Sequence, residues 1–485
     1  MLNELIDAIH AYLPDEDCTL IEKAYRFSSL AHTNQKRASG DTFFTHCLSV
    51  AEILAGIKID TATIAAALLH DVLEDTAITP AQLTDEFGTE ITTLVQGVTK
   101  ISSYHFVDQE MAQAENWRKM LLAVTRDIRI ILIKLADRLN NMRTISFLPP
   151  DKQKRIALES MNLYAPFAQR LGMYRWKSEL EDLSFNVLQP DEYRCLHDAW
   201  EQREESHEHH LKDWIKLLED VLSPYEIPFR LSARPKSLYG IYKKMERQHK
   251  AFSEIQDLIG LRLITDTVAN CYALLGLVHT HWSPVENTFT DYISVPKINM
   301  YQSLHTSITG PGKVLAEIQI RTEEMHKRCE YGIAAHWRYK NHGAKIVSGV
   351  TTAEEIDQKL DWLRQVLEWQ DELKDPQEFL SAIKTECTFE QVFVFTPQGK
   401  VIKLPEGATP VDFAYAVHSD IGDHCFGAKV GDKLVPLDYH FHSGEICEIL
   451  TRKNVHPTKH WLEFAITAQA RSRIRRFLRE NEAKG

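Results

Sequence analysis

Residues 68–76 read LLHDVLEDT and place one histidine and three carboxylates within a single short segment. On a continuous helix, at about 100° per residue, His70, Asp71, Glu74 and Asp75 share one arc, and the leucines lie on the opposite side. The segment therefore predicts an amphipathic helix with an acidic face. Because neighbouring carboxylates repel one another, it also predicts a cation, a proton or an arginine among them.

Two further segments provide partners for this acidic face. FFTHCLSVAEIL places His46 at the start of one predicted helix, and KLADRLNNMRT places Asp137 on another. Taken singly, these residues would be explained as a buried histidine and an aspartate in an ion pair. Together with His70 and Asp71 they form a ligand set that suits Mn²⁺, Fe²⁺ or Zn²⁺, so we predict a divalent metal site.

The periodicity of apolar residues divides the chain into regions. Residues 1–195 repeat apolar side chains at every third and fourth position, which predicts an all-helical domain. Residues 196–340 mix helical and period-2 segments, which predicts an α+β domain. A linker and a helix are expected at 341–388, a small domain that begins with a hairpin and a helix at 389–451, and the start of a helical region at 452–485.

Composition narrows the class of protein. The 485 residues carry a formal net charge of −12, which disfavours a protein that coats nucleic acid. The eight cysteines form no CxxC pair, so neither a zinc ribbon nor a disulfide framework is predicted. Because the N-terminus lacks a signal-peptide pattern and no apolar run reaches membrane-spanning length, we predict a cytoplasmic protein without a membrane segment.

A second set of polar residues lies in the α+β region, which contains no P-loop motif. A predicted helix entered through Pro235 carries a basic face, made of Lys236, Gly240, Lys243 and Arg247. Taken alone, this face would be a solvated surface. However, Asp257 begins one predicted strand and Glu317 lies on the polar face of another. Two carboxylates beside a basic helix can hold Mg²⁺ against a triphosphate.

The helical domain resembles a known family. The pattern H…HD…D is that of HD phosphohydrolases, and KRASGDTFFTH, HDVLEDT and KLADRLNNMRT resemble the hydrolase domain of the RelA/SpoT family of (p)ppGpp synthetase/hydrolases. The resemblance implies Mn²⁺ as the metal, with the ligands His46, His70, Asp71 and Asp137. It implies that Glu74 and Asp75 orient and deprotonate the attacking water. The residues implied to hold the guanosine nucleotide are Arg37, Ser39, Asn141 and Thr144.

The α+β domain resembles the nucleotidyltransferase-like synthetase domain of the same family, through ARPKSLYGIYKKM, DLIGLRLI, DYISVPKINMYQSLHT and EIQIRTEEMHKRCEYGIAAHWRYK. The implied reaction transfers the β,γ-pyrophosphate of ATP to the 3′-hydroxyl of GDP or GTP and releases AMP. The residues implied to grip ATP are Arg234, Lys236 and Lys243. Asp257 is implied to bind Mg²⁺, with Glu317 as a second metal contact or the base. Tyr301 is implied to stack on guanine, beside Lys297, Asn299, His305 and Gln319.

The synthetase motifs depart from the family pattern at three places, one of which is Ala233, where the family has glycine before Arg-Pro-Lys. The stretch Thr288–Asp291 fits neither the basic RxKD nor the acidic ExDD signature, and Met300 stands where the family motif NGYQS has glycine. These departures favour an alternative in which a hydrolase dominates over a weak synthetase.

The segment from Val392 to Thr451 resembles a TGS domain, a small β-grasp unit, which implies contact with tRNA and the ribosome. Because family members usually continue into further regulatory domains, we expect this chain to lack most of that C-terminal region.

The expected protein is a bifunctional enzyme of the stringent response that makes and degrades (p)ppGpp. A helical connector at about 140–195 is expected to couple the two activities, so that one site is competent at a time. A third possibility is a tRNA- or ribosome-responsive binding protein with vestigial catalysis. The intact HDxxED motif, Asp257 and Glu317 argue against it.

Overall fold

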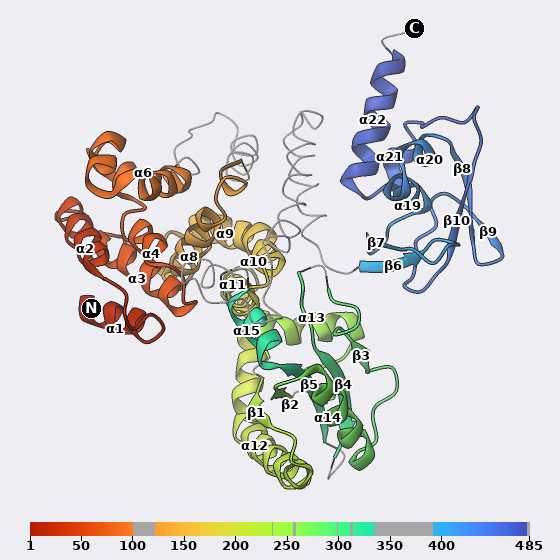
Figure 1. The fold of residues 1–485 in the computed structure, drawn as a ribbon, viewed down its shortest axis with the longest axis horizontal. Coiled ribbons are helices and arrows are strands. Elements are labelled where there is room, and N and C mark those ends of the chain that lie inside the picture. Colours follow the sequence, from red (N-terminus) through yellow and green to blue (C-terminus); the bar gives the residue numbers. More distant parts are fainter. Residues whose placement is uncertain are drawn as a thin grey trace. The chain divides into compact units, whose positions relative to one another are not determined.

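The computed structural model describes residues 1–99, 122–234, 236–255, 259–297, 299–310, 314–332, 334 and 391–482. The predicted linker and helix at 341–388 lie outside the described residues. The chain forms two compact units, Met1–Gln96 with Leu132–Thr352 and Gly97–Ile131 with Ala353–Gly485, which are described separately. Figure 1 labels their elements along the chain. None of the described helices combines the length and the apolar character that crossing a bilayer requires.

The N-terminal region is helical in its described part, as the apolar spacing predicts. Its helices are α1 Leu2–His10, α2 Thr19–Ala31, α3 Phe43–Gly56, α4 Thr61–Leu68, α5 Val72–Asp75, α6 Pro80–Thr99 and α8 Arg129–Arg143. Asp60 caps α4, because its carboxylate accepts a hydrogen bond from the backbone N–H of Thr63 at 2.9 Å. Leu54 of α3, Leu68 of α4 and Leu139 of α8 are fully buried. The packing of these apolar faces thus brings His46, His70 and Asp137 close to one another.

A series of helices then leads into the α+β region. They are η1 Ile145–Phe147, α9 Pro150–Glu159, η2 Ser160–Tyr164, α10 Ala165–Arg170, α11 Tyr174–Leu188 and α12 Pro190–Leu222. The predicted boundary between residues 195 and 196 falls inside α12, which is one uninterrupted helix of 33 residues. Pro190 suits the first turn of a helix, where the proline nitrogen needs no hydrogen-bond partner. The helix therefore begins six residues before the predicted domain boundary.

The α+β region is built on one five-stranded sheet. Its strands are β1 Phe229–Ala233, β2 Ile259–Thr265, β3 Thr290–Asp291, β4 Leu304–Thr309 and β5 Leu315–Thr322, in the order β1-β2-β5-β4-β3. The pair β2–β5 is parallel and the others are antiparallel. The accompanying helices are η3 Ser223–Tyr225, α13 Leu238–Gln248, η4 Phe252–Glu254, α14 Val268–His281 and α15 Glu323–Tyr331.

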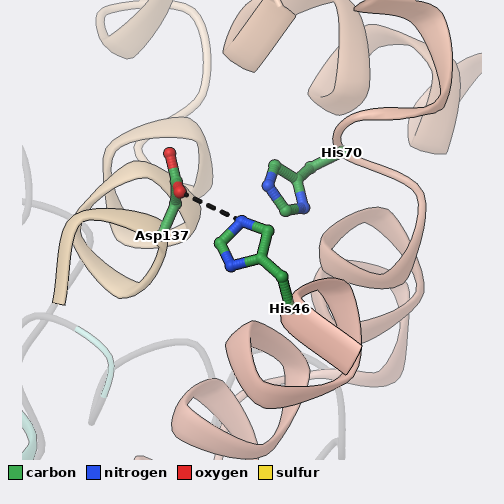
Figure 2. A group of neighbouring side chains, drawn as sticks. All are labelled: His46, His70 and Asp137. Carbon is green, nitrogen blue, oxygen red and sulfur yellow. Dashed lines mark ion pairs between the residues drawn. The ribbon is translucent and has the colours of Figure 1, made fainter. Parts of the chain in front are cut away.

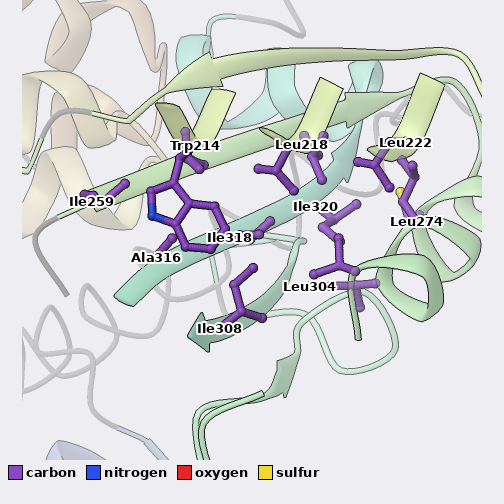
Figure 3. Packing of buried hydrophobic residues seen from close by; sticks show 14 of the residues in the cluster. Trp214, Leu218, Leu222, Ile259, Leu274, Leu304, Ile308, Ala316, Ile318 and Ile320 are labelled. Atoms are coloured by element: carbon purple, nitrogen blue, oxygen red, sulfur yellow. The ribbon is translucent and has the colours of Figure 1, made fainter. Parts of the chain in front are cut away.

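One face of this sheet is buried under α12 and α14. Figure 3 shows Trp214 and Leu218 of α12 packed with Ile318 of β5, and all three are at most 3% exposed. Because side chains alternate along a strand, Glu317 and Gln319 point to the opposite face. The hydrophobic core thus leaves that other face for polar chemistry.

The helix α13 begins later than the sequence predicted. Ser237 is its N-cap, with the Ser237 hydroxyl accepting a hydrogen bond from the N–H of Gly240 at 3.1 Å. Lys236 therefore precedes the helix and does not share a face with Lys243. The predicted entry through Pro235 is wrong because a serine side chain satisfies the first helical N–H groups more effectively.

The C-terminal unit contains the predicted hairpin and the predicted helix from Pro410. Its elements are β6 Gln391–Phe395, β7 Val401–Pro405, α19 Pro410–Val417, α20 Ser419–Asp423, β8 Cys425–Val430, β9 Lys433–Val435, β10 Cys447–Thr451, α21 Trp461–Phe464 and α22 Ala468–Glu482. The strand β8 pairs antiparallel with both β9 and β10.

A single buried carboxylate joins two parts of this unit. Asp412, in the first turn of α19, accepts hydrogen bonds from the N–H and hydroxyl of Thr409 and from the N–H and hydroxyl of Thr467, at 2.7 to 2.9 Å. It also accepts one from the N–H of Ile466 at 3.0 Å. Trp461 and Ile474 pack into the same core as the apolar side of α19. The helices after β10 are therefore part of this folded unit.

Candidate metal centre and nucleotide site

The segment 68–76 is not one continuous helix, so that prediction is wrong. The helix α4 ends at Leu68 and the single-turn α5 starts at Val72, which leaves His70 and Asp71 in the turn between them. The Nδ1 atom of His70 donates to the carbonyl of Ala67 at 2.8 Å and so caps the end of α4. The leucine spacing runs on through the break, and for this reason periodicity alone indicated a helix.

Three side chains meet at this turn. His46 comes from α3, His70 from the turn and Asp137 from α8, and their potential ligand atoms all lie within 4.8 Å of one another. Figure 2 shows the two imidazoles and the carboxylate converging, with His46 Nε2 lying 3.3 Å from Asp137 Oδ1. Asp71 joins them, because its carboxylate oxygens lie 3.6 Å from His46 Nε2 and 3.1 Å from His70 Nε2. All four residues predicted as metal ligands are thus brought together.

The imidazoles are held in the orientation that a metal needs. The Nδ1 atom of His46 donates to Oδ1 of Asn140 at 2.7 Å, as that of His70 does to Ala67. Each Nε2 atom faces the cluster and offers its lone pair once a cation displaces the proton there. The Nε2 atom of His70 is buried and makes no hydrogen bond. A buried nitrogen without a hydrogen bond, aimed at two carboxylates, fits a divalent cation.

The electrostatics also favour positive charge at this place. Burial alone would raise the pKa of Asp137, but the Lys134 ammonium, 2.8 Å away, and the nearby His46 hold that pKa well below its usual range. Burial would lower the pKa of His70, and the adjacent Asp71 carboxylate raises it well above its usual value. The cluster therefore attracts a cation or a proton.

Glu74 and Asp75 lie on α5, immediately after the cluster, and both are exposed. They are outside the group of converging ligand atoms. The surrounding protein removes part of the water around the Asp75 carboxylate, and this desolvation together with the neighbouring Asp71 raises the pKa of Asp75, which makes its carboxylate a better proton acceptor than an isolated one.

Two of the four residues predicted to hold guanosine are linked to the cluster. Arg37 donates to the side-chain oxygens of Asn140 and Asn141, and Asn141 donates to Asp137 Oδ1 at 2.6 Å. By contrast, Ser39 donates to Asp41 at 2.8 Å, and the Thr144 hydroxyl donates to the backbone carbonyl of Asn140 in the last turn of α8. The structure therefore joins Arg37 and Asn141 to the metal centre and gives Ser39 and Thr144 local partners.

A second polar centre lies on the sheet face opposite α12 and α14, where Gln319 and Arg321 are buried and Glu317 is 20% exposed. Glu317 is 3.0 Å from Arg234, 3.2 Å from Lys236 and 3.6 Å from His305 Nδ1. Burial alone would raise the pKa of Glu317, but His305 and the two cations hold it well below its usual range. Glu317 is therefore ionised beside two cationic side chains. Asp257, its predicted partner for Mg²⁺, lies outside the described residues.

The predicted guanosine residues gather next to Glu317. The Tyr301 hydroxyl lies 2.8 Å from His305 Nε2, and Lys297 Nζ lies 5.5 Å from the centre of the Tyr301 ring. Gln319 donates to Glu317 at 3.3 Å. Met300 has a φ of 62°, in the left-handed region that favours glycine, so the departure from the family motif falls at a strained position.

Asn299 is the exception in this group. Its side-chain amide donates to the carbonyl of Gln169 at 3.1 Å and to the hydroxyl of Tyr174. It is only 4% exposed. In this structure the predicted guanosine ligand is therefore bonded to the helical connector.

Lys244 was missed by the sequence analysis. It lines an open cavity of about 640 Å³ together with Lys250, Thr288 and Ser307. Ser307 pairs with Glu317 in the sheet, so this cavity lies beside the second centre. Lys243, chosen from the predicted helix face, is instead exposed and lies 3.2 Å from Glu246.

Family models match the chain in three regions: an HD domain at 24–174, the region found in RelA / SpoT proteins at 233–344, and a TGS domain at 392–451. A GTP pyrophosphokinase of Myxococcus xanthus is 47% identical over 477 residues, which is 98% of this chain and 62% of that protein. A protein of Synechocystis named probable guanosine-3′,5′-bis(diphosphate) 3′-pyrophosphohydrolase is 47% identical over 95% of this chain and 60% of its own length. The chain thus spans about three fifths of these relatives.

A solved structure of a metazoan orthologue of SpoT, described as hydrolysing ppGpp, aligns with 39% of this chain and 97% of its own. The sequence identity is 22% and the TM-score is 0.27.

Proposed function

The chain belongs to the RelA/SpoT family, and from that membership we propose that it is a bifunctional alarmone enzyme. One centre would hydrolyse (p)ppGpp to GDP or GTP and pyrophosphate. The other would transfer pyrophosphate from ATP to the 3′-hydroxyl of GDP or GTP, giving (p)ppGpp and AMP. The observation that carries the proposal is the buried convergence of His46, His70 and Asp137.

In the hydrolytic centre we assign His46, His70, Asp71 and Asp137 as ligands of Mn²⁺. A bound divalent cation lowers the pKa of a water molecule and polarises the phosphate. Asp75, with its raised pKa, and Glu74 stand one turn away to take the proton of that water. Arg37 and Asn141 sit at the edge of the cluster, where they would bind the nucleotide together with Ser39 and Thr144.

In the synthetic centre we assign Arg234 and Lys236 to the ATP phosphates and Glu317 to Mg²⁺ or to the 3′-hydroxyl proton, with Asp257 as the other Mg²⁺ ligand. We replace Lys243 by Lys244 as the third lysine at the phosphates, because Lys244 lines the cavity beside Glu317. The guanosine would lie against Tyr301, with the polar contacts Lys297, Asn299, His305 and Gln319.

The proposed domains are the hydrolase with its connector up to residue 189, the synthetase from 190 to 340, the linker at 341–388, and the TGS domain from 389. We assign tRNA and the ribosome as partners of the TGS domain, on the family model alone.

The two centres are proposed to communicate through the connector. Tyr174 of α11 accepts a hydrogen bond from Asn299, and its ring meets that of Tyr301 edge to face at 5.3 Å. Guanosine bound at Tyr301 would compete with the connector for the Asn299 amide. Occupation of one centre would thereby shift the helices that lead back to the other.

A second candidate function is a hydrolase with a weak synthetase, which the positive φ of Met300 favours. Two assays separate the candidates: ppGpp with Mn²⁺, and ATP with GDP and Mg²⁺. Asp71→Ala should abolish hydrolysis and spare synthesis, and Glu317→Gln should do the reverse. Loss of both activities in either variant would contradict the assignment to separate centres, and the absence of turnover in both assays would leave only a binding role.

A further inference from the structure

The metal centre contains a second, overlapping group of potential ligands. The first group is His46, His70 and Asp137, and the second is Cys47, His70 and Asp71, whose ligand atoms also lie within 4.8 Å of one another. We propose that the second group is an alternative ligand set for a thiophilic divalent cation of the zinc type, and that this cation excludes the hydrolytic metal. The inference rests on the proposed function only for the role of the first group.

The thiol is buried where a cation would need it. Cys47 follows His46 on α3 and has no exposed surface. The Cys47 thiol interacts with the side chains of His32 and His70. His32 is itself only 1% exposed, its Nδ1 atom is used by Gln35, and its Nε2 atom makes no hydrogen bond. The thiol thus has two buried imidazoles as neighbours, and one of them, His70, also belongs to the first ligand group.

The two ligand sets differ in chemical character. The first set offers imidazole nitrogen and carboxylate oxygen, which accept Mn²⁺. The second adds sulfur, a soft ligand that prefers Zn²⁺, Cd²⁺ or Co²⁺. On binding, the S–H bond of Cys47 breaks, a sulfur–metal bond forms and the proton leaves to solvent, so no redox partner is needed. Of the three ligands in this set, Asp71 is the one with exposed surface, at 16% of its side chain.

His70 makes the two sets mutually exclusive. Its Nδ1 atom is already bonded to the carbonyl of Ala67, so Nε2 alone is available to a metal. One nitrogen lone pair binds one cation. A cation held through Cys47 would therefore take His70 from the hydrolytic metal and would stop hydrolysis without any change in the protein's fold.

The first test uses absorption and not activity. Metal-free protein titrated with Co²⁺ should develop a sulfur-to-cobalt charge-transfer band in the near ultraviolet. Cys47→Ser should lose this band, and the matched variant Cys18→Ser, which alters another buried thiol, should retain it. No band in the wild-type protein, or a band that survives in Cys47→Ser, would overturn the proposal.

The second test measures competition. Free Mn²⁺, followed by electron paramagnetic resonance, should be released from the wild-type protein by stoichiometric Zn²⁺. Cys47→Ser and Cys47→Ala should bind Mn²⁺ unchanged, which also reports correct folding, and should need about tenfold more Zn²⁺. Zinc bound through sulfur without release of Mn²⁺ would refute mutual exclusion. If the band and the competition appear but ppGpp is not hydrolysed, the proposed function fails and this inference stands.

Discussion

The Oδ1 atom of Asn140 lies 2.7 Å from Nδ1 of His46. This contact places the proton on Nδ1 and turns the Nε2 lone pair of His46 toward Asp137. Asn140→Ala should therefore lower the affinity for Mn²⁺ by about 10- to 100-fold, measured by titration with electron paramagnetic resonance. Asn34→Ala, which removes an exposed asparagine side chain, is the control and should bind Mn²⁺ as the wild type does. Equal affinities in the two variants would show that Asn140 does not orient the imidazole.

Lys244 and Lys243 provide a matched pair in the synthetase. Lys244→Ala should raise the KM for ATP by about tenfold, because a charge-assisted hydrogen bond to phosphate contributes about 1.5 kcal/mol. Lys243→Ala removes an exposed lysine that faces Glu246 and should change the KM less than twofold. Initial rates of AMP formation at varied ATP measure both. The opposite order of effects would restore the assignment made from sequence.

Tyr174→Phe removes one acceptor of the Asn299 amide and leaves the other, the carbonyl of Gln169. Releasing Asn299 to the guanosine should then be easier, so the KM for GDP should fall about two- to tenfold, which corresponds to one hydrogen bond. The KM for ATP should not change. Tyr225→Phe loses a hydroxyl bonded to His281 on the surface and is the control. A higher KM for GDP in Tyr174→Phe would mean that this tyrosine assists the nucleotide directly.

His326 should make stability depend on pH. Burial and the adjacent Arg321 lower the pKa of His326 to about 4, against about 6.5 in an unfolded chain. Between these values the unfolded chain binds a proton that the folded one does not, so stability is full above pH 6.5 and is lost as the pH falls toward 4. Between pH 7 and pH 5 the loss of stability attributable to His326 should be about 2 kcal/mol.

Urea unfolding at pH 7 and pH 5 measures this effect. His326→Gln should flatten the pH dependence, whereas His209→Gln, at a side chain that is 77% exposed, should not. An unchanged slope in His326→Gln would exclude His326 as its source.

The sequence predicted which segments form helices and strands more accurately than it predicted where those helices and strands begin and end. Periodic apolar residues predicted the helices that carry His46 and Asp137, and the alternation in β5 predicted the polar face of Glu317. The break before His70 was not predicted, because a side chain replaces the backbone hydrogen bond there while the leucine pattern continues. A side chain that takes over a backbone hydrogen bond in this way does not alter the spacing of the apolar residues, so the sequence does not show it.

The contacts between distant segments were also invisible in the sequence. Nothing in the spacing of Asn299 indicates that it bonds to Gln169, 130 residues earlier in the chain. The second ligand set could not be predicted either. Cys47 follows His46 in the sequence, but only the fold shows that His70 lies close to both. Pairings of this kind depend on how the helices pack and not on any one segment.

The hydrogen bonds of Asp412 bear on how the C-terminal unit can be excised for study. The TGS match ends at residue 451, yet three of the donors to this buried carboxylate come from Ile466 and Thr467. A fragment trimmed at Thr451 would keep a buried charge without those donors and would expose the apolar side of α19. We expect such a fragment to aggregate, and we expect a fragment that extends through Glu482 to be recovered folded. The segment that folds on its own is therefore longer than the segment that matches the TGS family model.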